Sequence, residues 1–70
     1  MKAYKMDGEG LFWLSDGAGR DLVKAGSRGE FELRLAAMGA RMSGGWRPFA
    51  YYNNSDKPVC WQADVEEERE

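Results

Sequence analysis

Residues 27–45 read SRGEFELRLAAMGARMSGG, and this stretch carries the clearest local pattern in the 70-residue chain. Ser27 and Glu30 have the spacing of a capping box, in which a hydroxyl and a carboxylate accept hydrogen bonds from the free N–H groups at a helix start. Apolar side chains then recur at i, i+4, i+7 and i+11, the spacing of one helix face. They are Phe31, Leu35, Met38 and Met42. The pattern predicts a helix from about Arg28 to Met42 that stops at Gly44-Gly45.

Short segments with strand-like patterns flank this helix on both sides. Those before it are Lys2–Met6, Leu11–Leu14 and Asp21–Ala25, separated by turns rich in glycine and aspartate. Those after it are Trp46–Tyr52 and Val59–Ala63, separated by a polar loop. Pro48 favours a sheet edge or a bulge for the first of these. The order ββ(β)αββ predicts a small α+β domain, an antiparallel sheet of four or five strands with one helix packed on one face.

The distribution of charge divides the chain into a domain, residues 1–63, and an acidic C-terminal tail, residues 64–70. Residues 1–62 carry nine basic and seven acidic side chains (9 − 7 = +2), whereas residues 63–70 carry five acids and one arginine (1 − 5 = −4). The acidic residues of interest are Asp64, Glu66, Glu67 and Glu68. Such a run is typical of a solvated terminus, and the alternative is an arm that docks on a basic surface or shields the domain from nucleic acid.

Histidine is absent and Cys60 is the single cysteine, which excludes Ser–His and Cys–His nucleophile pairs, thiolate metal clusters and an internal disulfide. No segment matches a phosphate-binding loop, a dinucleotide fingerprint or a calcium loop. Apolar runs such as Leu11–Leu14 are far too short for a membrane span or a signal-peptide core. We therefore expect a cytoplasmic, non-enzymatic protein without a metal or other cofactor.

The far side of the predicted helix is less polar than a helix on a single sheet requires. Its small and apolar residues are Leu33, Ala36, Ala37 and Ala40, and Arg34 and Arg41 share its flank. We interpret this side as a dimer face or a face for a partner helix. The alternative is that the alanines raise helix propensity and that Leu33 is an ordinary exposed leucine.

The predicted strands contain more aromatic residues than one helix can cover. Neighbouring residues of a strand point to opposite faces of a sheet, so Phe12 and Trp13 are separated, as are Tyr51 and Tyr52. Some rings should therefore lie on the uncovered face, unless they cover the sheet themselves or the tail folds back over it; the candidates are Trp13, Trp46, Tyr51, Tyr52 and Trp61. Exposed rings beside arginine anchor protein interfaces or stack single-stranded bases. The partner-binding residues we predict are Trp13, Arg34, Arg41, Trp46, Arg47, Tyr51 and Tyr52.

The charge balance disfavours direct binding of nucleic acid, because such domains are usually strongly basic. We therefore interpret the chain as a protein-binding inhibitor or adaptor that acts on a larger host protein or complex, with a homodimer as a further expectation. Small chains without catalytic groups are common among viral, phage and mobile-element inhibitors of host nucleic-acid-handling machinery, anti-CRISPR proteins among them. The alternatives are a regulator that binds single-stranded nucleic acid on the uncovered aromatic face, and a structural or assembly component of a larger particle.

Overall fold

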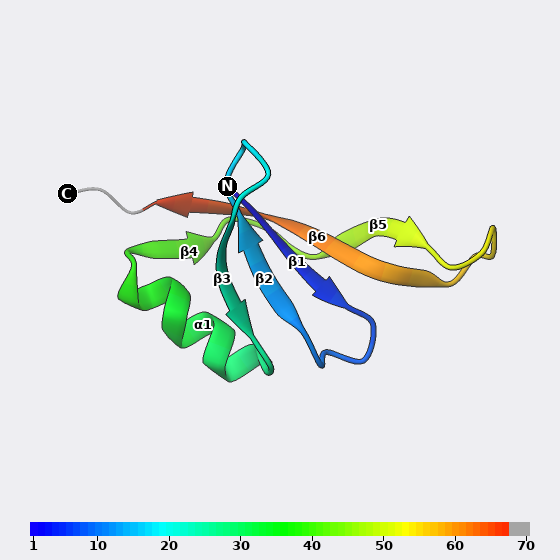
Figure 1. Ribbon diagram of the computed structural model, residues 1–70, viewed down its shortest axis with the longest axis horizontal. Helices are drawn as coiled ribbons and strands as arrows, with labels where there is room; N and C mark the ends of the chain where they lie inside the picture. Colours follow the sequence, from blue (N-terminus) through cyan, green and yellow to red (C-terminus); the bar gives the residue numbers. More distant parts are fainter. Residues whose placement is uncertain (68–70) are drawn as a thin grey trace.

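One helix and six antiparallel strands occupy residues 1–67, which are the residues that the computed structural model describes (Figure 1). The elements are β1 (Lys2–Met6), β2 (Phe12–Ser15), β3 (Asp21–Ala25), α1 (Arg28–Ala37), β4 (Ala40–Met42), β5 (Arg47–Tyr51) and β6 (Pro58–Glu67). The predicted α+β class, with one helix against an antiparallel sheet, is confirmed. The sheet has one strand more than the predicted maximum, and its order is βββαβββ.

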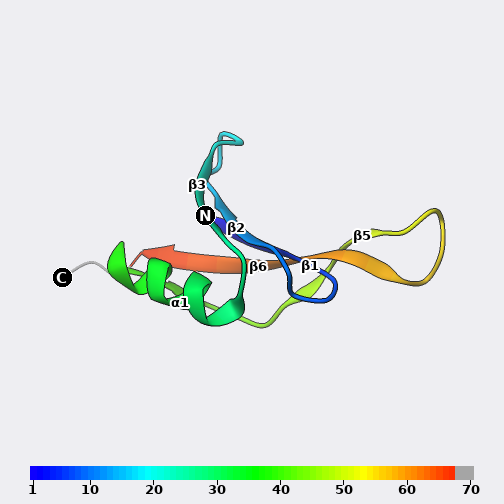
Figure 2. The same cartoon turned by 60° about the horizontal axis from the view of Figure 1, so that its bottom comes forward.

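The sheet is ordered β3-β2-β1-β6-β4, and β5 also pairs with β6. One edge of β6 pairs with β1, from Lys2 opposite Asp64 to Met6 opposite Cys60. The other edge is divided between β4 and β5. The sheet curls so that α1 contacts β3 and β2 as well as β4, at the opposite end of the strand order. The hairpin of β5 and the first half of β6 extends away from the helix as an arm (Figures 1 and 2).

The core lies between α1 and the face of the sheet that it covers. Phe12, Leu14 and Phe31 are its largest fully buried side chains, and the rings of Phe12 and Phe31 stack with centroids 5.4 Å apart. The other buried members of this cluster are Ala3, Ala25, Leu35, Ala40 and Val65. Burial of these apolar side chains supplies the main driving force for docking the helix on the sheet.

The predicted start of the helix is confirmed. The Oγ atom of Ser27 accepts a hydrogen bond from the N–H of Glu30 at 3.3 Å, as an N-cap residue does. The carboxylate of Glu30 accepts a bond from the N–H of Gly26 at 3.2 Å, one residue before the usual capping-box donor. Glu30 also pairs with Arg34 one turn along the helix, at 2.9 Å.

The predicted end of the helix at Gly44-Gly45 is wrong, because α1 stops at Ala37 and Ala40–Met42 forms β4. Gly39 has φ +75°, in the left-handed region that glycine adopts without steric cost, and its N–H donates to the carbonyl of Ala36 at 3.1 Å. The expected apolar stripe therefore ends early. Phe31 and Leu35 are buried in the core, whereas Met38 is 42% exposed and Met42 belongs to the sheet.

The expectation of an acidic tail from residue 64 is also wrong for its first part, because β6 continues to Glu67. Val65 is buried in the core, and the acidic residues on either side of it point the other way. Asp64 pairs with Lys2 and Arg47, and Glu66 pairs with Arg41. The acidic residues at 64–67 thus belong to the sheet. Glu68 and the rest of the expected tail lie outside the described residues.

Two glycine substitutions should change stability in opposite directions. Gly39→Ala should lower the free energy of unfolding by roughly 1–2 kcal/mol, because alanine is strained in the left-handed region. Gly29→Ala is the matched control: this position lies inside α1, a Cβ there would meet nothing within 4 Å, and the change should stabilise by about 0.5–1 kcal/mol. Urea unfolding of both variants measures the two effects. A Gly39→Ala variant as stable as the parent chain would contradict the assigned helix end.

Candidate functional site

The sheet face opposite to α1, here called the open face, carries a row of three aromatic rings. Tyr4 stacks on Trp13 of the neighbouring strand with centroids 5.3 Å apart, and Phe49 meets Tyr4 edge to face at 5.2 Å. Tyr4 and Trp13 are opposite each other in the β1–β2 register, one position away from the buried pair of Ala3 and Leu14. Trp13 thus lies on the uncovered face. Sequence reasoning missed Tyr4 and Phe49, although the alternation of buried Ala3 with Tyr4 is a signal that could have found the first.

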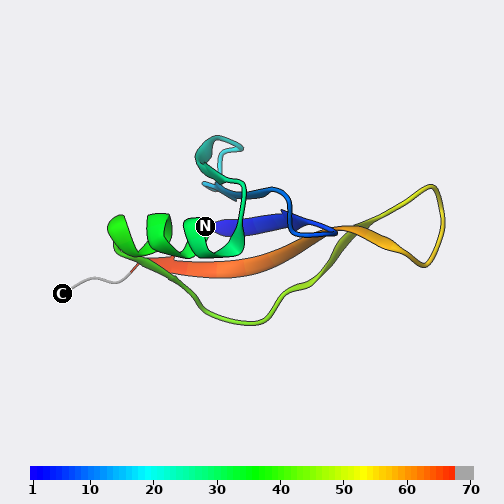
Figure 3. The same ribbon diagram turned by 90° about the horizontal axis from the view of Figure 1, so that it is seen from below.

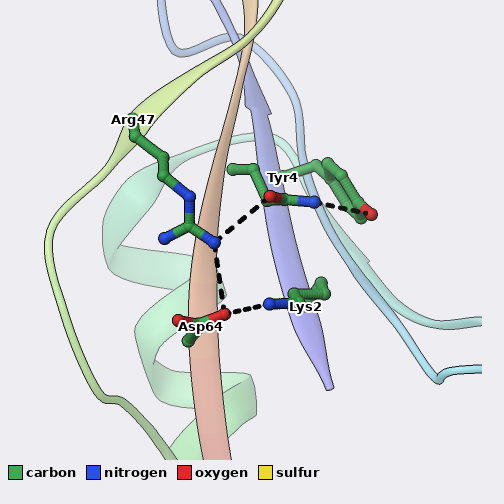
Figure 4. A network of polar contacts seen from close by, with 5 residues as sticks. Lys2, Tyr4, Arg47 and Asp64 are labelled. Carbon is green, nitrogen blue, oxygen red and sulfur yellow. Dashed lines mark hydrogen bonds and ion pairs between the residues drawn. The ribbon is translucent and has the colours of Figure 1, made fainter.

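A polar network crosses the open face beside these rings (Figure 4). Asp64 pairs with both Lys2 and Arg47, and the hydrogen bonds from these two cations lower the pKa of the Asp64 carboxyl. Arg47 also donates to the Oε1 atom of Gln62 at 3.3 Å, and Gln62 donates through Nε2 to the Tyr4 hydroxyl at 3.2 Å. The predicted partner-binding residue Arg47 is therefore tied into the face by a carboxylate and an amide.

Trp46 and Trp61 lie on the other side of the sheet, around Lys5. The Lys5 ammonium is 5.3 Å from the ring centroid of Trp46 and 5.6 Å from that of Trp61, within the range of cation–π attraction. The Trp46 ring also packs edge to face on Phe12 of the core, at 6.0 Å. Trp46 was predicted to bind a partner, but the structure places it in packing against the core, because the chain enters β5 from the side that α1 covers.

Glu9, in the β1–β2 turn, joins that turn to the first turn of α1. Its carboxylate accepts two hydrogen bonds from the Arg28 guanidinium, at 3.1 and 2.6 Å, and one from Lys5 at 3.0 Å. These bonds, with Arg28 contributing most, lower the pKa of Glu9 from 4.5 to about 2. Every group in this cluster has an oppositely charged partner, so the cluster serves the fold.

The arm exposes three aromatic side chains, one of which is Phe49 of the open-face row. Phe49, Tyr51 and Tyr52 are 54%, 53% and 63% exposed, so neither tyrosine is covered although neighbouring strand residues were expected to point to opposite faces. Asn53 and Asn54 at the tip both have positive φ, at 47° and 60°, which asparagine tolerates better than most residues.

Backbone hydrogen bonds close the tip of the arm on both sides of this asparagine pair. The N–H of Ser55 donates to the Tyr52 carbonyl at 2.8 Å, and the N–H of Tyr52 donates to the Lys57 carbonyl at 3.0 Å. The hydroxyl of Ser55 in turn accepts from the N–H of Lys57 at 3.1 Å. The tip is therefore held in one turn conformation.

The predicted dimer face is only partly on the helix. Leu33 is 73% exposed, and Ala36 and Ala37 are exposed beside it. Ala40, in contrast, is buried in β4. The prediction that Arg34 and Arg41 share a helix flank is wrong, because the helix ends before Gly39. Arg34 pairs with Glu30 on α1, whereas Arg41 lies in β4, with its Nη2 atom 3.7 Å from Oε2 of Glu66.

Residues 1–67 contain no group of three or more histidine, cysteine, aspartate or glutamate side chains arranged to hold a metal ion. Within the same range, the helix lacks the length and apolar character needed to cross a bilayer. Burial raises the pKa of the Cys60 thiol. A scan against protein families finds no match to this chain, and searches of curated proteins and of solved structures find none either.

Stability should depend on pH through Glu9. As the pH falls below 4.5, the unfolded chain takes up a proton at Glu9 that the folded chain refuses until about pH 2, so the stabilisation is present above pH 4.5 and lost towards pH 2. Glu9→Gln should therefore lower the urea midpoint at neutral pH and leave it close to the parent value near pH 2. Asp56→Asn removes an exposed carboxylate near the tip of the arm and controls for net charge. An equal effect of Glu9→Gln at both pH values would contradict the ion cluster.

Proposed function

We propose that this chain is a non-enzymatic, protein-binding inhibitor or adaptor, and that the arm is the element that contacts its partner. The observation that carries the proposal is the presence of three large aromatic side chains, each more than half exposed, on one projecting hairpin. These are Phe49, Tyr51 and Tyr52. The hairpin that carries them projects from the rest of the fold (Figures 1 and 3). Buried aromatic anchors dominate the energetics of protein interfaces, and rings held out in this way are available to be buried by a partner.

The composition of the arm also supports protein binding. The tip reads Tyr51-Tyr52-Asn53-Asn54-Ser55, which combines rigid amphipathic rings with small hydrogen-bonding side chains, as antibody loops do. The hydrogen bonds that close the turn hold these residues in place before binding. An ordered binding element loses less conformational entropy on association than a flexible one does.

The outer edge of β5 favours contact through side chains over the addition of a strand. Pro48 lacks a backbone N–H, and the β5–β6 register shifts between Pro48 and Ala50 and again between Ala50 and Tyr51, as the sequence predicted for an edge or a bulge. The charges of Asp56 and Lys57 near the tip cancel. The arm therefore fits an apolar groove of a protein better than the phosphates of a nucleic acid.

The class of partner remains the one that the sequence favours, a larger host protein or complex, including nucleic-acid-handling machinery of the kind that phage and mobile-element inhibitors block. A small chain can inhibit such a target by occupying its surface without any chemistry of its own. A projecting arm on a small body suits that mode of action. A cytoplasmic location belongs to the same proposal.

Binding of single-stranded nucleic acid on the open face is less favoured. Tyr4 and Trp13 stack on each other, so their facing surfaces are not available to bases. Lys2, Arg47 and Lys24 each have an aspartate partner within 4.0 Å, so phosphate contacts would have to replace existing ion pairs. A structural role in a larger particle is the third alternative.

The test is capture of a partner from host-cell lysate by the tagged full chain, with and without nuclease treatment. We expect a discrete protein that survives nuclease and that the Tyr51→Ser/Tyr52→Ser variant captures at least about tenfold less well, because two aromatic anchors are lost. Leu33→Ser is the matched control, since it removes a comparably exposed apolar side chain from α1 and should leave capture unchanged. Near-ultraviolet circular dichroism of each variant checks that the fold is intact.

Three results would overturn this proposal. Recovery of nuclease-sensitive material alone would favour binding of single-stranded nucleic acid over binding of a protein. Equal capture of the same protein by the arm variant would show that the arm does not contact the partner. Purification of the chain as a large, stable particle without any partner would favour the structural role.

A further inference from the structure

The edge strand β3 differs from the strands at the opposite edge of the sheet. Within the described residues β3 pairs with β2 alone, which leaves its outer side without a neighbouring strand. At the opposite edge, β4 has only three residues, and β5 contains Pro48 and two register shifts. Short strands, proline and bulges all hinder pairing with another chain. The β3 edge has one register shift, against two in β5, but it contains no proline and extends over five residues.

A bulge in β3 brings two opposite charges to the same face. Leu14 is opposite Val23, but Ser15 is opposite Asp21, so Leu22 is an extra residue in the ladder. Because of this extra residue, Asp21 and Lys24 both lie on the open face, with Asp21 Oδ2 and Lys24 Nζ 3.6 Å apart. Without the bulge, residues three apart in a strand would point to opposite faces.

A hollow of about 420 Å³ runs alongside this edge, between β3 and the second half of α1. Its lining residues are Leu22, Val23, Lys24, Arg34, Ala37 and Met38. Leu22 and Met38 are large apolar side chains that are 40% and 42% exposed there. The edge thus combines an unpaired strand with apolar surface that further burial would stabilise.

We propose that the occupant of this edge is a second copy of the same chain, with the two β3 strands antiparallel about a two-fold axis between residues 22 and 23. The charge pattern argues for a copy of this chain over an unrelated strand. In this register Asp21 of each copy lies opposite Lys24 of the other, on the same face, so two ion pairs form across the axis. Leu22 of each copy lies over the partner's hollow.

This pairing goes beyond the proposed function, because it uses neither the arm nor the open-face rings. It also differs from the helix-face dimer expected from Leu33, Ala36 and Ala37. A two-fold interface must be complementary to itself, and the Asp21–Lys24 pattern meets that condition with a residue of each sign on each copy. The helix face offers only an exposed leucine among small residues.

The test is sedimentation equilibrium of the full chain over a range of concentrations, with charge reversals at the edge. The parent chain should show a monomer–dimer equilibrium. Asp21→Lys alone and Lys24→Glu alone should each raise the dissociation constant at least about tenfold, because each places like charges opposite each other twice. An equimolar mixture of the two variants should restore association, since every pair across the axis is then of opposite sign.

The mixture separates the interface from effects inside one chain. In the mixture, residues 21 and 24 of each variant chain still carry like charges and repel each other within that chain. Restored association can therefore only come from contacts between copies. Leu33→Ser and Tyr51→Ser/Tyr52→Ser should associate as the parent does, which keeps this test independent of the partner-binding arm. A parent chain that stays monomeric at every concentration, a mixture that does not associate, or loss of the dimer in Leu33→Ser would overturn the proposal.

Discussion

Strand β6 pairs with three other strands, and the positions of the helix and the arm both depend on how it divides its two edges. One edge pairs with β1, while residues 65–67 of the other pair with β4 and residues 58–62 pair with β5. The chain must therefore leave β6 after β4 and return to the same edge further along. This division places α1, which precedes β4, at one end of the strand and the arm at the other (Figure 1). Loss of the β4 pairing would remove the anchor of the C-terminal end of the helix.

The alternation of side chains along β6 explains why its acidic end is ordered. Ala63 and Val65 are buried, and Gln62 and Asp64 face the opposite side, where they bind Arg47 and Lys2. Two carboxylates in the second half of this strand, Asp64 and Glu66, thus offset two of the three positive charges that pair with them on Lys2, Arg41 and Arg47. The same ion pairs that fix the register of β1 on β6 reduce the attraction of that face for phosphate.

Local sequence patterns predicted the end of an element correctly where that end depends on neighbouring residues. They failed where pairing with a strand distant in the sequence determines the end. The cap at Ser27 was predictable because Glu30 lies within reach of it. The choice between Gly39 and Gly44 as the helix end was not, because both glycines can end a helix and the pairing of Ala40–Met42 with β6 selects the first. The strand around Val65 was missed for the same reason, because its pairing with β4 involves residues distant in the sequence. The acidic residues there indicate an exposed strand face, and they were interpreted as a tail.

The residues of the candidate site were likewise predictable in part. The alternation rule separated Phe12 from Trp13, and the excess of rings over available cover indicated that some rings are uncovered, but neither signal identified which ones. The position of Trp46 was not predictable, because a residue between two strands has no alternation to assign it to a face. Its packing on Phe12 and Lys5 follows from the path that β6 imposes on the returning chain.

The two proposed surfaces lie on different parts of the fold, and this has a consequence for binding. The molecule is elongated, with dimensions of 43 Å by 21 Å by 21 Å, and the arm lies at one end of its long axis (Figure 1). A dimer formed through β3 would leave both arms uncovered, so each assembly would present two copies of the same aromatic tip. Two linked tips bind a target with paired sites far more tightly than one tip does, because the second contact becomes intramolecular. Weak binding by a single arm is thus compatible with strong occupation of a symmetric or repetitive target, which is the geometry that many multi-subunit assemblies offer.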